Sequence, residues 1–353
     1  MRVRCPVCKK LNSSKVYFCG NCRYPVNVKN INLLSRSDLV SSCSDLLDVM
    51  SNERRSLFAN KKIEQVYDEL LSLNWLRPES AILRFVEAEI LLGFKKYLKY
   101  PVLDMGCGDG LFTSILFGAR INKQYDAYQS VDFSQKDVYN SYAASPEDLF
   151  YARPRAIGFG MDIKENAVRK ARELDVYDRV KVGDVRAIPF DNASVNSVFS
   201  NMIDDIKESD LVRVFEQVHR VLKKGGFFVF TSPTERFRDY LYHINKGQRQ
   251  RDRGRSDWQP RPMRLWQRIF GAASFELVEM VEYGNKNMMQ FWDTGFRPFF
   301  YPLMGSRKIL KDNDCYLPAK CIFLELAREY FLKYVSGQVS KRGAFRIIII
   351  RRI

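Results

Sequence analysis

The stretch Val102–Gly110, VLDMGCGDG, places one carboxylate and three alternate glycines directly after a short apolar run. Glycine reaches backbone angles closed to other residues and has no Cβ to block an approaching group. In an open α/β sheet, ligands bind beyond the carboxyl ends of the strands. Gly106, Gly108 and Gly110 therefore predict a ligand that lies close to the backbone at the end of this strand.

The spacing excludes two common phosphate-binding loops. A nicotinamide-binding loop has the pattern G-x-G-x-x-G, whereas here the third glycine comes one residue early and Leu111 occupies its place. No G-K-[ST] follows, which excludes a P-loop. Asp104 would repel a pyrophosphate and instead suits a ligand with a positive centre.

From Pro101 onward, strands and helices alternate. The predicted strands are Val102–Met105, Ala156–Asp162, Val180–Val182, Ser197–Asn201, Gly226–Thr231, Phe275–Glu282 and the terminal stretch GAFRIIIIRRI. Amphipathic helical stretches follow most of them, so the order predicts an α/β fold with a doubly wound, mainly parallel seven-stranded sheet and helices on both faces. We expect the terminal strand to pair antiparallel with the Phe275–Glu282 strand.

Five blocks occur in a fixed order within this region. They are VLDMGCGDG, GFGMDIKENAVRKAREL, VKVGDVRAIPF, DNASVNSVFSNMIDDI and VHRVLKKGGFFVFTSP. Together, over residues 101–282, they resemble the class I S-adenosylmethionine (SAM)-dependent methyltransferases, which have a Rossmann-like fold. The resemblance implies that the chain is an enzyme and that SAM is its co-substrate.

The resemblance also implies roles for individual residues. Asp104 and the three glycines would hold the methionyl part of SAM, Asp162 the ribose hydroxyls, and Asp184 with the backbone of Val185 the adenine; Asn201 completes the predicted cofactor set. The competing interpretation of Asp104 and Asp184 is a helix or turn cap. Asp162 comes 58 positions after Asp104, farther than the family pattern, so we predict an insertion at 119–155, with Asp132 as the alternative ribose acid.

Methyl transfer is an in-line displacement that needs alignment, a dry pocket and sometimes a base. Where many small-molecule and lipid methyltransferases have LEHI, this chain has IDDI, with Asp204 and Asp205 at the two central positions. These aspartates and His243 are the candidate catalytic residues, and a solvated helix start is the alternative for the aspartates. We interpret His219, in FEQVHRVL, as a packing residue.

The first residues carry a metal-binding pattern. Cys5, Cys8, Cys19 and Cys22 form C-x2-C-x10-C-x2-C, which predicts a structural Zn²⁺ site because two such turns complete a tetrahedron. Iron in the same cage is the alternative. Four thiolates leave no open position for catalysis.

Charge is concentrated in two segments. The formal net charge is +16; residues 1–37 contribute +8, and residues 246–268 contribute +6, from eight basic and two acidic residues. Such segments favour phosphate-bearing partners. An RNA partner is therefore an alternative to a small-molecule acceptor, and solvated loops are the neutral interpretation.

The leading expectation is a methyltransferase acting on a small molecule, such as a saccharide or lipid intermediate. The alternatives are a ribosomal RNA base methyltransferase, whose zinc-bearing members this chain partly resembles, and a SAM-binding scaffold without turnover. No apolar run approaches the roughly 20 residues that span a bilayer, which leaves peripheral membrane contact open, and no signal peptide is apparent, so we expect a cytoplasmic protein.

The predicted domains follow from these patterns. They are a zinc module (1–30), a helical extension (31–100), the SAM-binding core (101–284), a helical cap over the carboxyl edge of the sheet (285–342) and the final strand (343–353). Aromatic residues in NMMQFWDTGFRPFFYPLMG either line an acceptor pocket or pack the cap, and we favour packing.

Overall fold

The computed structural model describes residues 2–4, 11–13, 60–126, 145–242, 260–335 and 339–353. Backbone contacts divide the chain into two units, Met1–Leu57 with Tyr301–Glu329, and Phe58–Phe300 with Tyr330–Ile353. In the first unit, β1 (Arg2–Arg4) pairs antiparallel with β2 (Leu11–Ser13). Cys5, Cys8, Cys19, Cys22, Asp132 and His243 lie outside the described residues.

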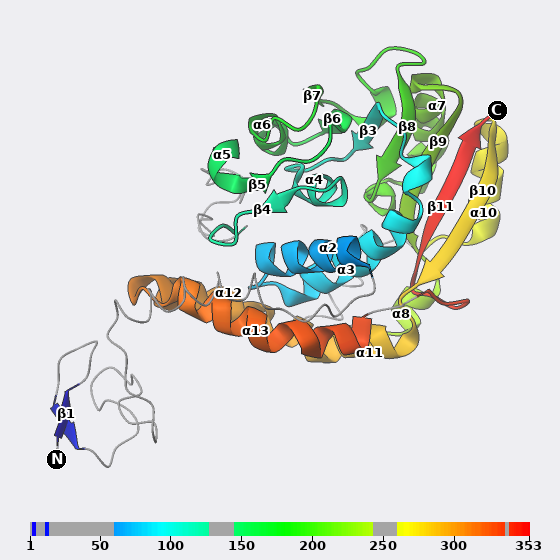
Figure 1. Cartoon of the computed structure of the whole chain (residues 1–353). Coiled ribbons are helices and arrows are strands. Elements are labelled where there is room, and N and C mark those ends of the chain that lie inside the picture. Colours follow the sequence, from blue (N-terminus) through cyan, green and yellow to red (C-terminus); the bar gives the residue numbers. More distant parts are fainter. Residues whose placement is uncertain (1, 5–10, 14–59, 127–144, 243–259, 336–338) are drawn as a thin grey trace. The chain divides into compact units, whose positions relative to one another are not determined.

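The second unit contains a seven-stranded sheet (Figure 1). Its strands are β3 (Val102–Met105), β6 (Gly158–Asp162), β7 (Arg179–Val182), β8 (Val195–Ser200), β9 (Leu222–Pro233), β10 (Phe275–Tyr283) and β11 (Phe345–Arg352). The spatial order is β10-β11-β9-β8-β3-β6-β7, and all neighbours are parallel except those of β11. The predicted Rossmann-like, mainly parallel sheet is confirmed.

The last strand pairs antiparallel with β10, as predicted, and also with β9. It therefore lies inside the sheet, a position that the sequence analysis did not specify. The four isoleucines 347–350 are fully buried. A strand with apolar residues on both faces is stable only when neighbours and helices cover it on every side.

Helices cover the sheet on both faces. The principal ones are α4 (Leu111–Leu116), α6 (Glu165–Glu173), α7 (Leu211–Val221) and α10 (Met263–Ala272). Helices α4 and α6 connect the strands on one side of the sheet, from β3 through β6 to β7. Helix α7 connects β8 to β9 on the other side. Because such crossovers are right-handed, the two sets lie on opposite faces.

Helix α7 illustrates how the spacing of apolar residues makes these segments helical. Its apolar residues recur at intervals of three and four, and Leu211, Val214, Phe215 and Val218 are fully buried against the sheet. His219 meets the ring of Phe275 edge-on at 5.5 Å between ring centroids, which confirms its interpretation as a packing residue.

Two helices precede the sheet in the chain, α2 (Lys61–Leu73) and α3 (Pro78–Gly93), followed by a 3-10 turn, η1 (Lys95–Tyr97). Pro78 is the first residue of α3, where its missing N–H costs nothing. Figure 1 shows both helices crossing below the carboxyl ends of the strands.

The insertion after β3 contains small elements. β4 (Arg120–Ile121) pairs antiparallel with β5 (Phe150–Ala152), and α5 (Pro146–Leu149) precedes β5. Short elements follow the later strands: η3 (Val185–Ala187), η4 (Ile203–Asp205), η5 (Glu208–Asp210) and α8 (Arg236–Asp239). The predicted insertion at 119–155 is thus present in its described parts.

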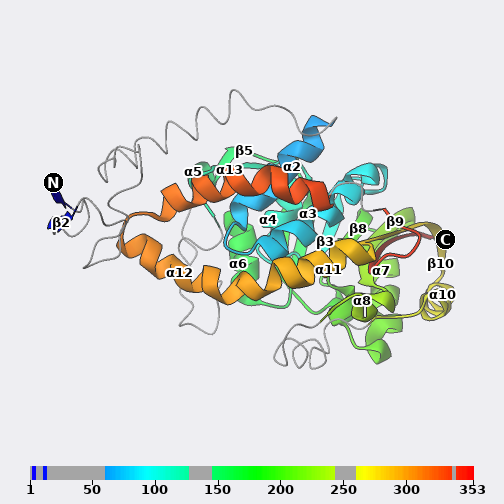
Figure 2. The ribbon, with the colours of Figure 1, turned by 90° about the horizontal axis from the view of Figure 1, so that it is seen from below.

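The segment expected to form a cap is helical in its described residues: α11 (Lys286–Gly295), η6 (Arg297–Phe299), α12 (Phe300–Asp312) and α13 (Tyr316–Val335) (Figure 2). In α11, Trp292 donates its ring N–H to the Glu79 carbonyl of α3 at 2.8 Å. Met288, Met289, Trp292 and Phe296 are buried, so the packing interpretation holds for them. Coverage of the sheet edge by the whole segment stays a prediction.

None of the helices in the described ranges combines the length and apolar character needed to cross a bilayer.

Candidate functional site

The glycine loop adopts the backbone conformation that its sequence requires. Gly106, Gly108 and Gly110 all have positive φ, at +82°, +56° and +81°. A Cβ on Gly106 would lie 2.3 Å from Cγ of Met202, whereas a Cβ on Gly108 would meet no atom within 4 Å. Gly106 is therefore required for packing, and Gly108 presents an open side that a ligand can approach.

Asp162 joins the next strand to this loop. The Gly108 N–H donates to Oδ2 of Asp162 at 3.0 Å, and the Lys164 N–H donates to Oδ1 at 2.9 Å. A carboxylate offers about four acceptor positions. Asp162 therefore retains capacity to accept from a pair of neighbouring hydroxyls beside the loop.

Asp104 lies beneath the loop. Its side chain is buried, and the Tyr177 hydroxyl donates to Oδ2 at 2.6 Å. Burial raises the pKa of this carboxyl to about 6. The structure thus gives Asp104 a partner within the protein, and its contact with a methionyl ammonium group stays a prediction.

Asp184 follows β7, the strand beside β6, whose Val182 is in register with Asp162. Its carboxylate accepts from the Arg186 N–H at 2.8 Å and pairs with the Arg186 guanidinium at 2.6 Å. The hydrogen bonds from Arg186 lower the pKa of Asp184. The capping interpretation is therefore correct for Asp184, and its contact with adenine stays a prediction.

An apolar side chain that the sequence analysis missed lies at the same edge. Ile163 directly follows Asp162 and is 64% exposed. Val185, half-buried, follows Asp184. The sequence could have signalled Ile163, because an apolar residue directly after an acid at the end of a predicted strand lies at the edge where ligands of such sheets bind.

The candidate residues after β8 lie beside β3. The Ser200 hydroxyl donates to the Met105 carbonyl at 2.8 Å and ties the two strand ends together. Asn201 is half-buried and Asp205 exposed. Burial, with the neighbouring Asp205 charge, raises the pKa of Asp204 to about 7. A carboxyl of this kind holds or releases a proton near neutral pH.

Helix α3 brings further ionisable groups to this edge. Arg84 and Glu87 form an ion pair of 3.0 Å, and the Arg84 guanidinium lies 5.1 Å from the centroid of the Phe112 ring. The charge of Arg84 acts on both Asp104 and Asp204 and offsets a small part of the rise in their pKa values. Neither α3 residue was predicted, because nothing in the local sequence places this helix over the strand ends.

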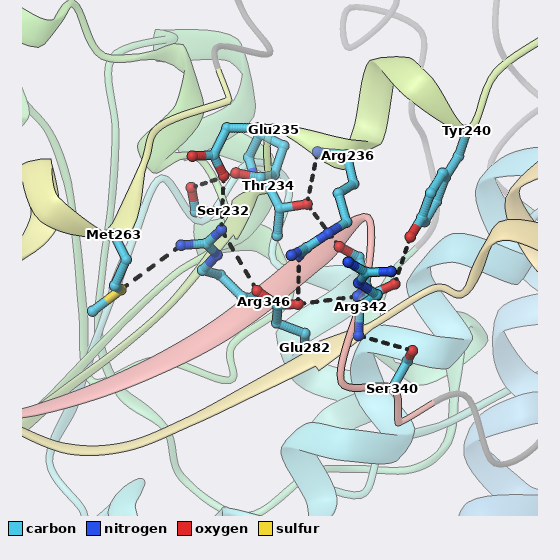
Figure 3. Close-up of polar contacts among 12 residues, drawn as sticks. Ser232, Thr234, Glu235, Arg236, Tyr240, Met263, Glu282, Ser340, Arg342 and Arg346 are labelled. Atoms are coloured by element: carbon cyan, nitrogen blue, oxygen red, sulfur yellow. Dashed lines mark hydrogen bonds and ion pairs between the residues drawn. The ribbon is translucent and has the colours of Figure 1, made fainter.

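A second polar cluster lies at the same edge of the sheet, where β9, β10 and β11 meet (Figure 3). Arg346 of β11 pairs with Glu282 at 3.6 Å and with Glu235 at 3.3 Å, and Arg236 pairs with Glu282 at 3.0 Å. The Gly343 N–H also donates to Glu282 at 3.1 Å. Positive and negative charges balance here, so this cluster acts as a structural clamp between β9, β10 and β11.

Part of the predicted basic segment 246–268 is also structural. Arg261 is buried and donates to the carbonyls of Ile203 and Ile206. It therefore belongs to the fold rather than to a phosphate-binding surface, whereas Arg264 and Arg268 are exposed. Among the residues that the structure describes, no group of three His, Cys, Asp or Glu side chains could hold a metal ion. The four cysteines of the predicted zinc site lie outside that search.

Comparison with known proteins gives a partial family match. Residues 145–230 match the methyltransferase domain family. This segment includes Asp162, Asp184 and Asn201 but begins after the glycine loop. A malonyl-[acyl-carrier protein] O-methyltransferase of Coxiella burnetii (strain RSA 493 / Nine Mile phase I) is 34% identical over 77 residues, which are 22% of this chain and 25% of the relative. The chain thus matches about a quarter of the length of that relative.

The solved structures to which this chain is similar have low sequence identity to it and TM-scores below 0.5. A sarcosine dimethylglycine methyltransferase candidate from Galdieria sulphuraria is 15% identical, with a TM-score of 0.42, over 78% of this chain and 86% of the other. A SAM-dependent methyltransferase from Thermotoga maritima, described as a possible histamine N-methyltransferase, is 12% identical, with a TM-score of 0.41, over 89% and 99% of the two chains.

Proposed function

We propose that this protein is a SAM-dependent methyltransferase. The observation that carries the proposal is the joining of Gly108 to Asp162 at the carboxyl ends of β3 and β6, with the outer side of Gly108 open. The strand order reverses at β3, since β6 lies on one side of it and β8 on the other. Ligands of open α/β sheets bind at such a reversal. The methyltransferase domain match at 145–230 supports the same function.

The site residues fit SAM better than a dinucleotide. Asp162 would accept from the two ribose hydroxyls, and Ile163 and Val185 would offer apolar contact to the adenine ring, with Asp184 beside it. The buried Asp104 and the nearby Asp162 make this edge negative, which favours a cationic sulfonium and disfavours a pyrophosphate. Bound SAM supplies an activated methyl group; the chain aligns it and excludes water.

SAM binding tests this proposal directly. We expect isothermal titration to give micromolar affinity for SAM, and Asp162→Ala to weaken it by at least about tenfold, because a carboxylate hydrogen bond of roughly 1.5–3 kcal/mol is lost. Asp178→Ala is the matched control. Asp178 lies at the amino end of β7, where its carboxylate accepts from Tyr100 at the opposite edge of the sheet. Unchanged affinity in Asp162→Ala, or tighter binding of a dinucleotide, would contradict the proposal.

For the acceptor, we propose a small molecule. The relative from Coxiella burnetii is named a malonyl-[acyl-carrier protein] O-methyltransferase, but the match covers only 22% of this chain. RNA is the alternative acceptor. The basic segment 1–37 supports it, whereas the burial of Arg261 removes one basic residue of segment 246–268 from the surface that could bind RNA. Cys5, Cys8, Cys19 and Cys22 are proposed to hold a structural zinc ion on the strength of their spacing.

A further inference from the structure

A group of polar side chains from four separate elements meets at the carboxyl edge, on the side of β3 away from Asp162. Glu87 and Arg84 come from α3, Asp204 follows β8, Thr231 lies in β9, and Tyr283 ends β10. Glu87 acts electrostatically on both Asp204 and Tyr283, and Thr231 lies close enough to the Glu87 carboxyl to offset part of the rise in its pKa. Asp204, Thr231 and Tyr283 follow β8 or lie in β9 and β10, on the side of the reversal point opposite β6 and Asp162.

Glu87 has an unused acceptor atom in this group. The residue is 6% exposed, and Arg84 donates to Oε2 at 3.0 Å. The other oxygen, Oε1, is buried and accepts no hydrogen bond from the described residues. A buried, unsatisfied carboxylate oxygen is costly. A ligand that donates a hydrogen bond to Oε1 would remove this cost.

Arg84 forms the outer side of this group. Its side chain is 42% exposed, whereas its partner Glu87 is buried. The charge of Arg84 acts on the buried Asp104 and on the half-buried Asp204. Phe112, under the guanidinium, provides an apolar wall. Arg84 is therefore the member of the group that an arriving ligand meets first.

We propose that Glu87 binds the methyl acceptor, and that the acceptor presents a neutral O–H or N–H group to it. This rests on the proposed methyltransferase function. In the reaction, the acceptor oxygen or nitrogen forms a bond to the methyl carbon, the methyl–sulfur bond breaks with its electron pair staying on sulfur, and the acceptor proton passes to the Glu87 carboxylate. Burial raises the pKa of Glu87, which favours its taking up that proton.

The charges of the group decide the acceptor class. Arg84 is already paired with Glu87, and Asp204 adds a second carboxyl. The cations beside these carboxyls are Arg84, already paired with Glu87, and Arg261, whose charge acts on Asp204. An acceptor carboxylate would be a third acidic group against these two cations, and like charges oppose binding. An alcohol or amine donates to Oε1 instead.

The chain offers a closely matched control. Glu79 lies on the same helix, is also 6% exposed, pairs with Arg77 at 2.9 Å, and also has a buried carboxyl oxygen without a partner among the described residues. It lies eight residues before Glu87, which is roughly 12 Å along the helix. Glu79→Gln therefore reproduces the loss of a buried helix charge away from the proposed acceptor.

The experiment supplies extract of the source organism with methyl-labelled SAM and measures label in small molecules, RNA and protein. We expect Glu87→Gln to reduce small-molecule labelling by about 100-fold, the usual scale of a proton-accepting group. Its SAM affinity should stay within about twofold of wild type, because α3 does not contribute to the Gly108–Asp162 contact. Glu79→Gln should label at the wild-type rate.

A second measurement needs no variant. Mild alkali releases methyl esters as volatile methanol, whereas methyl ethers and methylamines survive. We expect the wild-type label to be stable to alkali, and the mass spectrum to distinguish an ether from an amine. Wild-type labelling by Glu87→Gln, or label released as methanol, overturns this inference while leaving the methyltransferase proposal intact. Absence of SAM binding, or of any transfer by wild type, contradicts the proposed function itself.

Discussion

At the residue scale, substitution of Gly108 distinguishes an effect on ligand binding from an effect on stability. The φ of Gly108, +56°, disfavours an L side chain, but a Cβ there meets no protein atom within 4 Å. We expect Gly108→Ala to lower the free energy of unfolding by about 1 kcal/mol and to weaken SAM binding by at least about tenfold, because the new methyl group occupies the approach to the loop. Thermal unfolding and SAM titration measure the two effects.

Gly118 provides the control for this variant. It also has a positive φ, +104°, and no atom lies within 4 Å of the position that a Cβ would take, but the residue lies beyond α4 and away from the loop. Gly118→Ala should lower stability while leaving SAM affinity within about twofold of wild type. Equal loss of affinity in both variants would mean that backbone strain, rather than an occupied ligand approach, explains the result.

At the scale of single elements, α2 is fixed to the insertion by one buried acid. Glu69 accepts from the Ile121 N–H of β4 at 2.9 Å, and Arg120 lies 3.9 Å away. Burial raises the pKa of Glu69 to about 7 from its ordinary 4.5. The folded state therefore binds this proton more tightly than the unfolded state, so stability falls as pH rises between about 4.5 and 7.

Glu69→Gln tests this dependence. Glutamine still accepts from Ile121 but does not titrate, so wild type should lose up to about 3 kcal/mol more stability than the variant between pH 5 and pH 8. Urea unfolding at a series of pH values measures the difference. Glu173→Gln on α6, where the side chain is half exposed, should keep the wild-type dependence. A variant curve parallel to wild type would contradict the buried-acid explanation.

The elements that sequence predicted best are those whose signal is local. Helix α7 was found from its apolar spacing, and β3 from a short apolar run that ends in glycines. The α3 cluster was not found, because Arg84 and Glu87 resemble ordinary helix charges until the fold places α3 below the strand ends. Asp184 shows the converse: its position was predicted, but its pairing with Arg186 depends on a short turn formed only in the structure.

At the scale of the whole molecule, sheet order is the property that sequence specified least. The run Ile347–Ile350 predicted a buried strand, and its predicted antiparallel partner, β10, was correct. The position of β11 between β10 and β9 was not predicted, because it depends on pairing between strands far apart in the sequence. The clamp of Glu235, Glu282 and Arg346 fixes that arrangement at the carboxyl edge (Figure 3). The part of the carboxyl edge where we propose that the acceptor binds is thus assembled from residues far apart in the chain, such as Arg84 and Tyr283.

We expect loss of the N-terminal cysteines to remove bound metal without changing SAM binding. The unit that contains Gly108 and Asp162 runs over Phe58–Phe300 and Tyr330–Ile353, and its buried core consists of its own strands and helices. Cys5→Ser with Cys22→Ser should therefore reduce bound zinc from about one ion per chain to near zero, while SAM affinity stays within about twofold of wild type. Elemental analysis and SAM titration of the same preparations measure both. Iron in place of zinc would keep the four-cysteine site but change its metal, and wild-type chain without metal at these thiols would contradict the site.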